Sequence, residues 1–269
     1  MRLPEKYENE MKDLLQEEYE AYKESLSLPI QQGYRINTGK ISKEEWEKIA
    51  PFSAKEVPWI ENGYFLLDDF RASRHPYYFA GLYYLQEPSA MTPASRLPIE
   101  PDDRVLDLCA APGGKATELG SRISEGGMLL ANDISNSRAK ALLRNLEIQG
   151  VGRLLVTSED PEKLVTLYPA FFDKILLDAP CSGEGMFRKE SSMLRYYSEN
   201  GPEHYVPIQK KLIEQAYQML AEGGELLYST CTFSVKENEE VIAGLLDAHP
   251  DMEVQEITPG YEGFALGVS

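Results

Sequence analysis

The sequence has few residues of the two types that most often bind metals or form cross-links. It contains three cysteines and three histidines among 269 residues. Three cysteines cannot all pair, and none has a second ligand at the spacing of a zinc site. The composition therefore excludes a fold built on disulfides and predicts no bound metal. In a reducing compartment, all three thiols would remain free for chemistry.

Long hydrophobic runs are absent as well. The first ten residues, MRLPEKYENE, contain no apolar core of a signal peptide. No segment approaches the roughly 18 apolar residues of a membrane-spanning helix. We therefore expect a cytoplasmic protein, monomeric and without membrane association. With 42% hydrophobic residues, the chain can still bury a substantial core.

Positive charge is scarce relative to negative charge. The chain has 27 Lys and Arg against 44 Asp and Glu, so its formal net charge is −17. Contacts from Lys and Arg to phosphates supply much of the affinity for nucleic acids, so an RNA partner would need local basic patches. Three clusters offer such patches, namely Arg71 with Arg74 and His75, Arg188 with Lys189 and Arg195, and Lys210 with Lys211.

Short apolar runs alternate with helical segments in the second part of the chain. The runs cover residues 104–110, 127–134, 153–158, 172–178 and 225–230, and residues 135–149 and 207–221 are among the helical segments. Such alternation predicts a parallel sheet with helices on both faces. The expected fold class is therefore α/β, with a doubly wound, mostly parallel, Rossmann-like sheet.

The first third of the chain predicts a separate small α+β module. Residues 5–26 have helical spacing, strands are expected near 33–36 and 64–67, and a capping box at Ser42 opens a helix between them. Prolines after residue 92 mark a linker, so we place the boundary near residue 95 and expect domains at 1–94 and 95–269. A second capping box, from Ser234 to Glu237, predicts a helix just after the last strand.

A glycine-containing turn follows the first strand of the second domain. Its residues are Cys109, Ala110, Ala111, Pro112, Gly113, Gly114 and Lys115. The patterns of a phosphate loop and of a full dinucleotide fingerprint are both absent, and two glycines alone would favour a tight turn. However, Asp133 ends the next strand, at the place where such folds hydrogen-bond a ribose. Together these features predict a nucleoside cofactor at the carboxyl edge of the sheet.

Two cysteines follow two apolar runs that we expect to be neighbouring strands. Cys181 stands in Asp178-Ala179-Pro180-Cys181 and Cys231 in Ser229-Thr230-Cys231-Thr232. Either cysteine alone would be interpreted as a buried, inert thiol. A cysteine that adds to C6 of a pyrimidine turns C5 into a carbon nucleophile, which can take a methyl group from a sulfonium donor. The pair therefore predicts covalent chemistry on a nucleobase.

Four segments together resemble one family. LDLCAAPGGK, ANDIS, LLDAPCSGEGMFRK and YSTCTFSVKENE resemble the NOL/NOP/Sun family of RNA cytosine-5 methyltransferases, and HPYYFAGLYYLQEPSAM upstream is most similar to its bacterial members that modify small-subunit ribosomal RNA. The resemblance runs from about residue 70 to 245. It implies that residues 95–269 form an S-adenosylmethionine-dependent methyltransferase domain and that residues 1–94 are available for RNA contact.

The resemblance implies a role for each motif residue. Cys231 would attack C6 and Cys181 would assist release of the methylated base, while Asp178 would hydrogen-bond the N3 side of the cytosine beside Lys115. The cofactor S-adenosylmethionine would be held by Cys109, Ala110, Ala111, Pro112, Gly113, Gly114, Lys115, Asp133, Asp160 and Asp178. For the acid near the adenine, Glu159 and Asp160 are both candidates. No lysine or arginine follows Lys236, whereas family members usually continue into an RNA-binding domain, so we expect a shortened form.

Two other functions remain open on the sequence. A DNA cytosine-5 methyltransferase also uses a Pro-Cys nucleophile, which would make Cys181 the attacking residue and leave Cys231 without a role. A non-catalytic ribosome-assembly factor could keep the fold as an RNA-binding scaffold. Neither the nucleotide modified nor the number of sites follows from the sequence.

Overall fold

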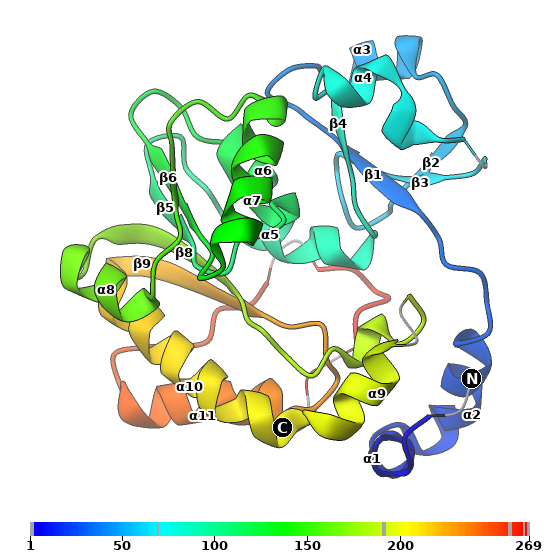
Figure 1. Cartoon of the computed structure of the whole chain (residues 1–269), viewed down its shortest axis with the longest axis vertical. Helices are drawn as coiled ribbons and strands as arrows, with labels where there is room; N and C mark the ends of the chain where they lie inside the picture. The colour runs from blue at the N-terminus through cyan, green and yellow to red at the C-terminus, as the bar shows by residue number, and fades with distance from the viewer. Residues whose placement is uncertain (1–2, 69, 190–191, 258–259, 266, 268–269) are drawn as a thin grey trace.

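The chain forms two sheets that lie side by side (Figure 1). The computed structural model describes residues 3–68, 70–189, 192–257, 260–265 and 267. A four-stranded antiparallel sheet lies within residues 33–85, and a five-stranded parallel sheet lies within residues 104–229. The predicted α/β class with a parallel sheet is confirmed.

The parallel sheet has the strand order β7-β6-β5-β8-β9. Its strands are β5 (Arg104–Asp107), β6 (Met128–Asn132), β7 (Leu154–Thr157), β8 (Phe172–Asp178) and β9 (Leu220–Ser229). The chain order reverses between β5 and β8. Open sheets of this type bind ligands beyond the carboxyl ends of the strands at such a point, which is where the predicted motifs begin.

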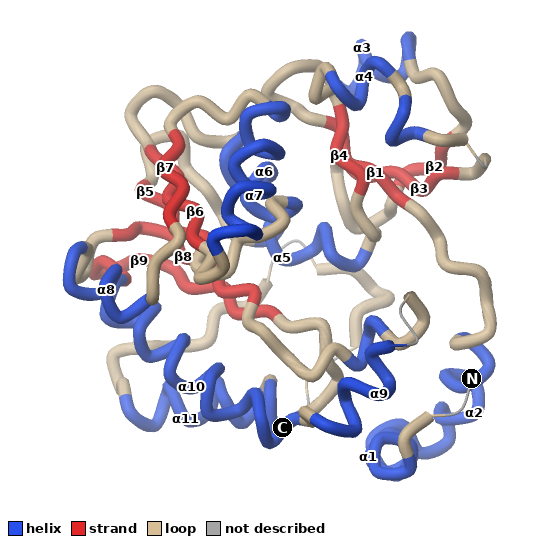
Figure 2. The backbone as a smooth tube through the Cα atoms, in the orientation of Figure 1, coloured by secondary structure: helices blue, strands red, loops and turns tan. Residues whose placement is uncertain are grey.

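Helices cover both faces of this sheet (Figure 2). One face carries α5 (Thr92–Arg96), α6 (Gly114–Ser121) and α7 (Asn136–Gln149), and the other carries α8 (Pro161–Leu167), α10 (Pro202–Met219) and α11 (Glu239–Ala248). Successive strand residues point to opposite faces, so Leu129 packs with α6 and α7 whereas Leu130 packs with α8 and α10. Of the helices in the described ranges, none is both long and apolar enough to cross a membrane.

The antiparallel sheet has the order β2-β3-β1-β4. Its strands are β1 (Gly33–Ile36), β2 (Ala54–Glu56), β3 (Gly63–Leu66) and β4 (Tyr83–Leu85), and α3 (Lys43–Ile49) and α4 (Pro76–Phe79) accompany them. The capping box at Ser42 is confirmed, because Ser42 and Glu45 hydrogen-bond each other's backbone amides. Aromatic rings around Tyr34 and Trp46 form the hydrophobic core that packs against this sheet.

The helix expected over residues 5–26 differs from the structure in shape and place. It divides into α1 (Glu5–Leu15), a 3-10 turn η1 (Gln16–Glu18) and α2 (Tyr19–Ser25), and Gln16 takes a positive φ of 47° at the break. Both helices lie beside η4 (Glu184–Met186) and α9 (Ser192–Glu199), away from the antiparallel sheet (Figure 1). Tyr7 makes edge contacts there with Phe187 and Tyr197.

The capping box predicted at Ser234 is wrong. A 3-10 turn, η5 (Val235–Glu237), precedes α11, and the side chain of Ser234 caps neither element. Local spacing suggested that Glu237 would return to the helix start. Its carboxylate instead accepts hydrogen bonds in the protein interior, and this position shapes the site described next.

Candidate active site

Cys181 and Cys231 lie in contact at the carboxyl edge of the parallel sheet. β8 and β9 are adjacent and parallel, with Asp178 paired to Ser229, as the sequence predicted for these strands. The two Sγ atoms are 3.0 Å apart, and the backbone N–H of Cys231 donates to Sγ of Cys181 at 3.3 Å. The pair of motifs therefore forms one site.

The contact between the thiols makes them chemically unequal. The hydrogen bond from Cys181 lowers the pKa of Cys231 from its usual value, since it stabilises the thiolate. The same hydrogen bond, aided by burial, raises the pKa of Cys181. Burial also raises the pKa of Cys109. Of the three thiols, Cys231 is the one that this environment prepares as a nucleophile.

We expect Cys231 to be alkylated faster than an ordinary cysteine at pH 7, because a lowered pKa increases its thiolate fraction. In Cys181→Ala the donor is lost, so the pKa of Cys231 should rise and its reaction with iodoacetamide should require higher pH. Mass spectrometry of the Cys231 peptide across a pH series measures both curves. Coincident curves for the variant and the wild-type chain would show that Cys181 does not activate its neighbour.

Lys115 and Asp178 form an ion pair beside the thiols. Lys115 Nζ lies 2.7 Å from one oxygen of Asp178, and the hydroxyl of Ser229 donates to the other oxygen at 2.8 Å. The predicted neighbours are thus in contact, and Ser229 is an additional member that the sequence analysis did not single out. The pair fixes the carboxylate at the end of β8, where it can bond a ligand.

Glu237 connects the loops that carry the two thiols. It is 0% exposed, and its carboxylate accepts from the backbone N–H and the hydroxyl of Ser182, which follows Cys181. It also accepts from the hydroxyl of Thr232, which follows Cys231, and from Nε2 of Gln209. Sequence spacing missed this role, because these partners come from separate segments of the chain.

The turn predicted to hold the cofactor begins α6. Gly113 adopts a φ of 112°, which is the left-handed region that favours glycine. Arg138 donates to the carbonyl of Ala111 and Asn145 to that of Pro112, so α7 fixes the turn from the side. The backbone of residues 109–115 therefore has a defined shape at a helix N-terminus.

Asp133 lies at the end of β6, nearly buried. Its carboxylate accepts from the backbone N–H of Ser135 at 3.0 Å and pairs with Arg138 at 3.1 Å. Arg138 therefore links Asp133 to the turn of residues 109–115, hereafter the cofactor turn. Nothing in the sequence pattern indicated this contact. Ile134 next to Asp133 is 67% exposed and offers an apolar surface at the same edge.

The two acids after β7 have different tasks within the chain. Asp160 caps α8 by accepting from the backbone N–H of Glu162 at 2.9 Å. Glu159 pairs with Lys163 one turn later, at 2.7 Å. Because both stand at the carboxyl edge beyond β7, both remain candidates for the acid near the adenine.

Asp107, at the end of β5, provides a test of whether a cationic nucleoside fits here. It is fully buried, and within the described chain no side chain donates a hydrogen bond to either carboxylate oxygen. Burial, reinforced by the charge of Asp178, raises the pKa of Asp107 to about 8. A carboxyl group left unpaired beneath the turn suits a ligand that carries positive charge, as S-adenosylmethionine does. Across the described ranges, no group of three His, Cys, Asp or Glu is placed to hold a metal ion.

Some of the basic residues singled out for RNA also serve the chain itself. Arg188 donates to the carbonyls of Leu28 and Pro29, and Arg195 pairs with Glu199. Lys211 pairs with Glu162. These contacts are solvent-exposed and therefore contribute little to stability.

Comparisons with known proteins agree with this arrangement. Residues 94–269 match the family model of the 16S rRNA methyltransferase RsmB/F, and residues 3–88 match that of the N-terminal domain of 16S rRNA methyltransferase RsmF. "Ribosomal RNA small subunit methyltransferase F" of Erwinia tasmaniensis is 37% identical over 259 residues, covering 92% of this chain and 54% of its own. The Escherichia coli K12 protein with that name is 36% identical, with 83% and 48% covered. The chain thus spans about half the length of these relatives.

Solved structures are similar as well. PH0851 superposes with a TM-score of 0.88 at 26% identity, covering 98% of this chain and 61% of its own. A methyltransferase homologue from Pyrococcus horikoshii has a TM-score of 0.74 at 33% identity, with 86% and 74% covered. NSun6 from the same organism, solved with SFG, has a TM-score of 0.80 at 23% identity, with 95% and 89% covered. The match over residues 94–269, with the paired thiols and the cofactor turn, places this chain in the 16S rRNA methyltransferase RsmB/F family.

Proposed function

We propose that this chain transfers a methyl group from S-adenosylmethionine to C5 of a cytosine in RNA, with small-subunit ribosomal RNA as the substrate. The observation that carries the proposal is the contact between Cys181 and Cys231 beside the pair of Lys115 and Asp178. Family membership and the names of the curated relatives support the choice of ribosomal RNA.

The proposed reaction begins with covalent addition of Cys231 to the cytosine. Its thiolate forms a bond to C6 of the cytosine, and the electron pair displaced from the C5–C6 double bond makes C5 nucleophilic. Asp178 holds the N3 side of the base, because its carboxylate can accept from the N4 amino group and from N3 once N3 is protonated as the adduct forms. Lys115 keeps that carboxylate in place. S-adenosylmethionine, when bound, would supply an electrophilic methyl group: the electron pair at C5 would form the new C–C bond, and the bond from the methyl carbon to sulfur would break to leave a neutral thioether.

Release requires a second step at the same carbon pair. A general base takes the proton from C5. The electron pair of the C5–H bond restores the C5–C6 double bond as the bond from C6 to Sγ of Cys231 breaks. We assign assistance in this step to Cys181, whose Sγ lies 3.0 Å from that of Cys231. The cytosine must be unstacked from its neighbours in the RNA, since C5 and C6 react from above and below the ring.

The cofactor would lie along the carboxyl edge of the parallel sheet. The turn from Cys109 to Lys115 would hold its methionine part, Asp133 its ribose, and Ile134 would offer an apolar contact to the adenine. The unpaired, buried Asp107 supports a positively charged ligand at this place.

Calorimetric titration with S-adenosylmethionine tests the cofactor site. We expect wild-type chain to bind and Asp133→Ala to bind at least about tenfold more weakly, because hydrogen bonds to a charged group contribute about 1.5–3 kcal/mol each. Parallel titrations of Glu159→Ala and Asp160→Ala decide which acid contributes on the adenine side. If folded wild-type chain does not bind, the proposed cofactor is wrong.

A further inference from the structure

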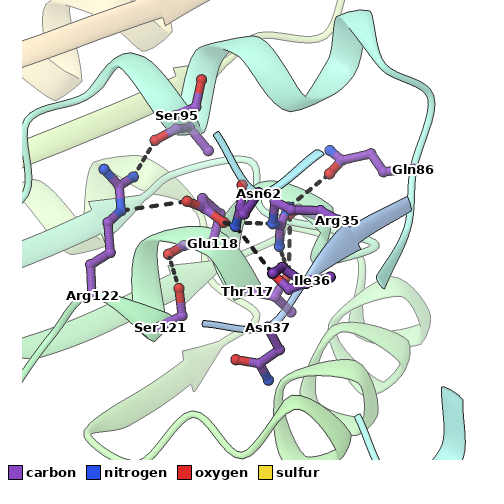
Figure 3. A network of polar contacts seen from close by, with 12 residues as sticks. Arg35, Ile36, Asn37, Asn62, Gln86, Ser95, Thr117, Glu118, Ser121 and Arg122 are labelled. Atoms are coloured by element: carbon purple, nitrogen blue, oxygen red, sulfur yellow. Dashed lines mark hydrogen bonds and ion pairs between the residues drawn. The ribbon is translucent and has the colours of Figure 1, made fainter. Parts of the chain in front are cut away.

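A buried polar network joins the antiparallel sheet to helix α6 (Figure 3). At its centre is Arg35 on β1. Its guanidinium donates to the carbonyl of Gly114 at 3.0 Å and to the hydroxyl of Thr117 at 2.8 Å, both in the first turn of α6. It also donates to Oε1 of Gln86 at 2.8 Å. The two bonds to α6 join residues that are 79 and 82 positions apart in the sequence. They connect the antiparallel sheet to a helix that packs on the parallel sheet.

An ion pair completes the network. Nε of Arg35 lies 2.5 Å from Oε2 of Glu118, and the two side chains are only 3% and 8% exposed. Asn62, next to β3, donates to the same oxygen of Glu118 (Figure 3). A buried charge pair of this kind is costly to desolvate. Nε of Arg35 makes the ion pair without a hydrogen bond, so the geometry depends on the three hydrogen bonds that the other two guanidinium nitrogens donate.

A separate observation shows that the cofactor turn itself rests on the antiparallel sheet. A Cβ atom added to Gly114 would lie 3.0 Å from Nε2 of Gln86 and 3.2 Å from Cε1 of Tyr84. Both contacts are tighter than most real Cβ contacts. The second glycine of the turn therefore allows close approach of side chains from β4 and the residue after it, which would have to shift by a few tenths of an ångström to admit a Cβ.

The module also fastens the neighbouring helix. Asn37 donates to the carbonyl of Gln149, at the end of α7, and Lys40 donates to that of Ile148. Since α7 bears Arg138 and Asn145, which hold the cofactor turn, the antiparallel sheet supports the turn through two helices.

We infer that Arg35 is a positioning residue for S-adenosylmethionine and that the antiparallel sheet is a structural part of the cofactor site. Arg35 does not touch the cofactor in this inference. It fixes the carbonyl of Gly114, and with it the first turn of α6, whose backbone would face the ligand. The inference rests on the proposed cofactor and adds the residue that holds its site in shape. A planar guanidinium suits this task because its rigid fork bonds several acceptors in fixed directions, whereas the three donors of a lysine ammonium rotate about a flexible stem.

Two arginines on the same carboxylate provide a matched experiment. Arg122, at the C-terminal end of α6, also pairs with Glu118, at 3.7 Å, but its other bonds go to the carbonyls of Ala94 in α5 and of Leu97 just after α5. We expect Arg35→Lys to raise the Kd for S-adenosylmethionine about tenfold, and Arg122→Lys to change it less than twofold. Both should lower the unfolding temperature. Calorimetry well below that temperature measures affinity on folded chains.

Equal affinities for the two variants would overturn the inference, since loss of stability alone would then account for both. If Arg35→Lys does not fold, Gln86→Ala tests the same contact, because it removes one acceptor of Arg35 and the packing against Gly114. That variant should bind threefold to fivefold more weakly, and unchanged affinity would equally overturn the inference. Wild-type chain that fails to bind at all would instead refute the proposed cofactor.

Discussion

Cys231→Ala is expected to abolish methylation and to leave no protein bound to RNA, because the covalent attack on C6 cannot begin. We expect a loss of at least about three orders of magnitude in rate, as for removal of other covalent nucleophiles. Cys181→Ala should behave differently. Attack and methyl transfer still occur in that variant, more slowly because the pKa of Cys231 rises, but release is slowed further, so a covalent complex of protein and RNA accumulates.

Denaturing gels of each variant with ribosomal RNA and S-adenosylmethionine distinguish these outcomes, and reactions without cofactor serve as controls. Accumulation in the Cys231 variant would invert the roles. RNA containing 5-fluorocytosine extends the test, since the fluorine blocks release from the wild-type chain. RNA adducts through Cys231 support the proposal. DNA adducts through Cys181 would favour a DNA methyltransferase, and no adduct at all would favour an RNA-binding scaffold.

Glu237→Gln is expected to slow methylation about 100-fold while the Kd for S-adenosylmethionine stays within twofold. The carboxylate holds Ser182 and Thr232, the neighbours of the two thiols, so its loss lets both loops shift. A displacement of about 1 Å at reacting groups can cost about 10²-fold in rate. The cofactor turn lies on other elements and should be unaffected.

Stability provides a second readout for this variant. The glutamine replaces one carboxylate oxygen with an NH2 group, which is a donor and faces the donors of Ser182 and Gln209. We therefore expect the free energy of unfolding to fall by about 3 kcal/mol. Denaturant titration measures that change, and rates are compared where both chains are folded. Wild-type rates in Glu237→Gln would show that the thiols do not depend on this link.

The sequence predicted those features that local patterns encode. Apolar runs between turn residues marked the five strands of the parallel sheet, and the parallel order brought Cys181 and Cys231 to one edge. The capping box at Ser42 was correct because all its partners lie within one turn of helix. Strands β2 and β4 were missed, as each has only three residues.

Features that depend on distant partners could not be predicted in this way. Glu237 has the local spacing of a capping residue, but four donors from three segments compete for its carboxylate and are satisfied in the interior. Arg35 has no sequence signal at all for its bonds to α6. The position of α1 and α2 against α9 likewise results from packing of aromatic rings far apart in the chain.

The contact between the thiols also determines how the protein responds to oxidants. The thiolate of Cys231 can attack hydrogen peroxide, which forms a sulfenic acid and releases hydroxide, and Cys181 can then attack that sulfur with loss of water. The net change removes two electrons and one proton from the thiolate–thiol pair and joins the sulfurs. Because the oxidised form has no nucleophile, activity would return only when a thiol reductant reopens the bond.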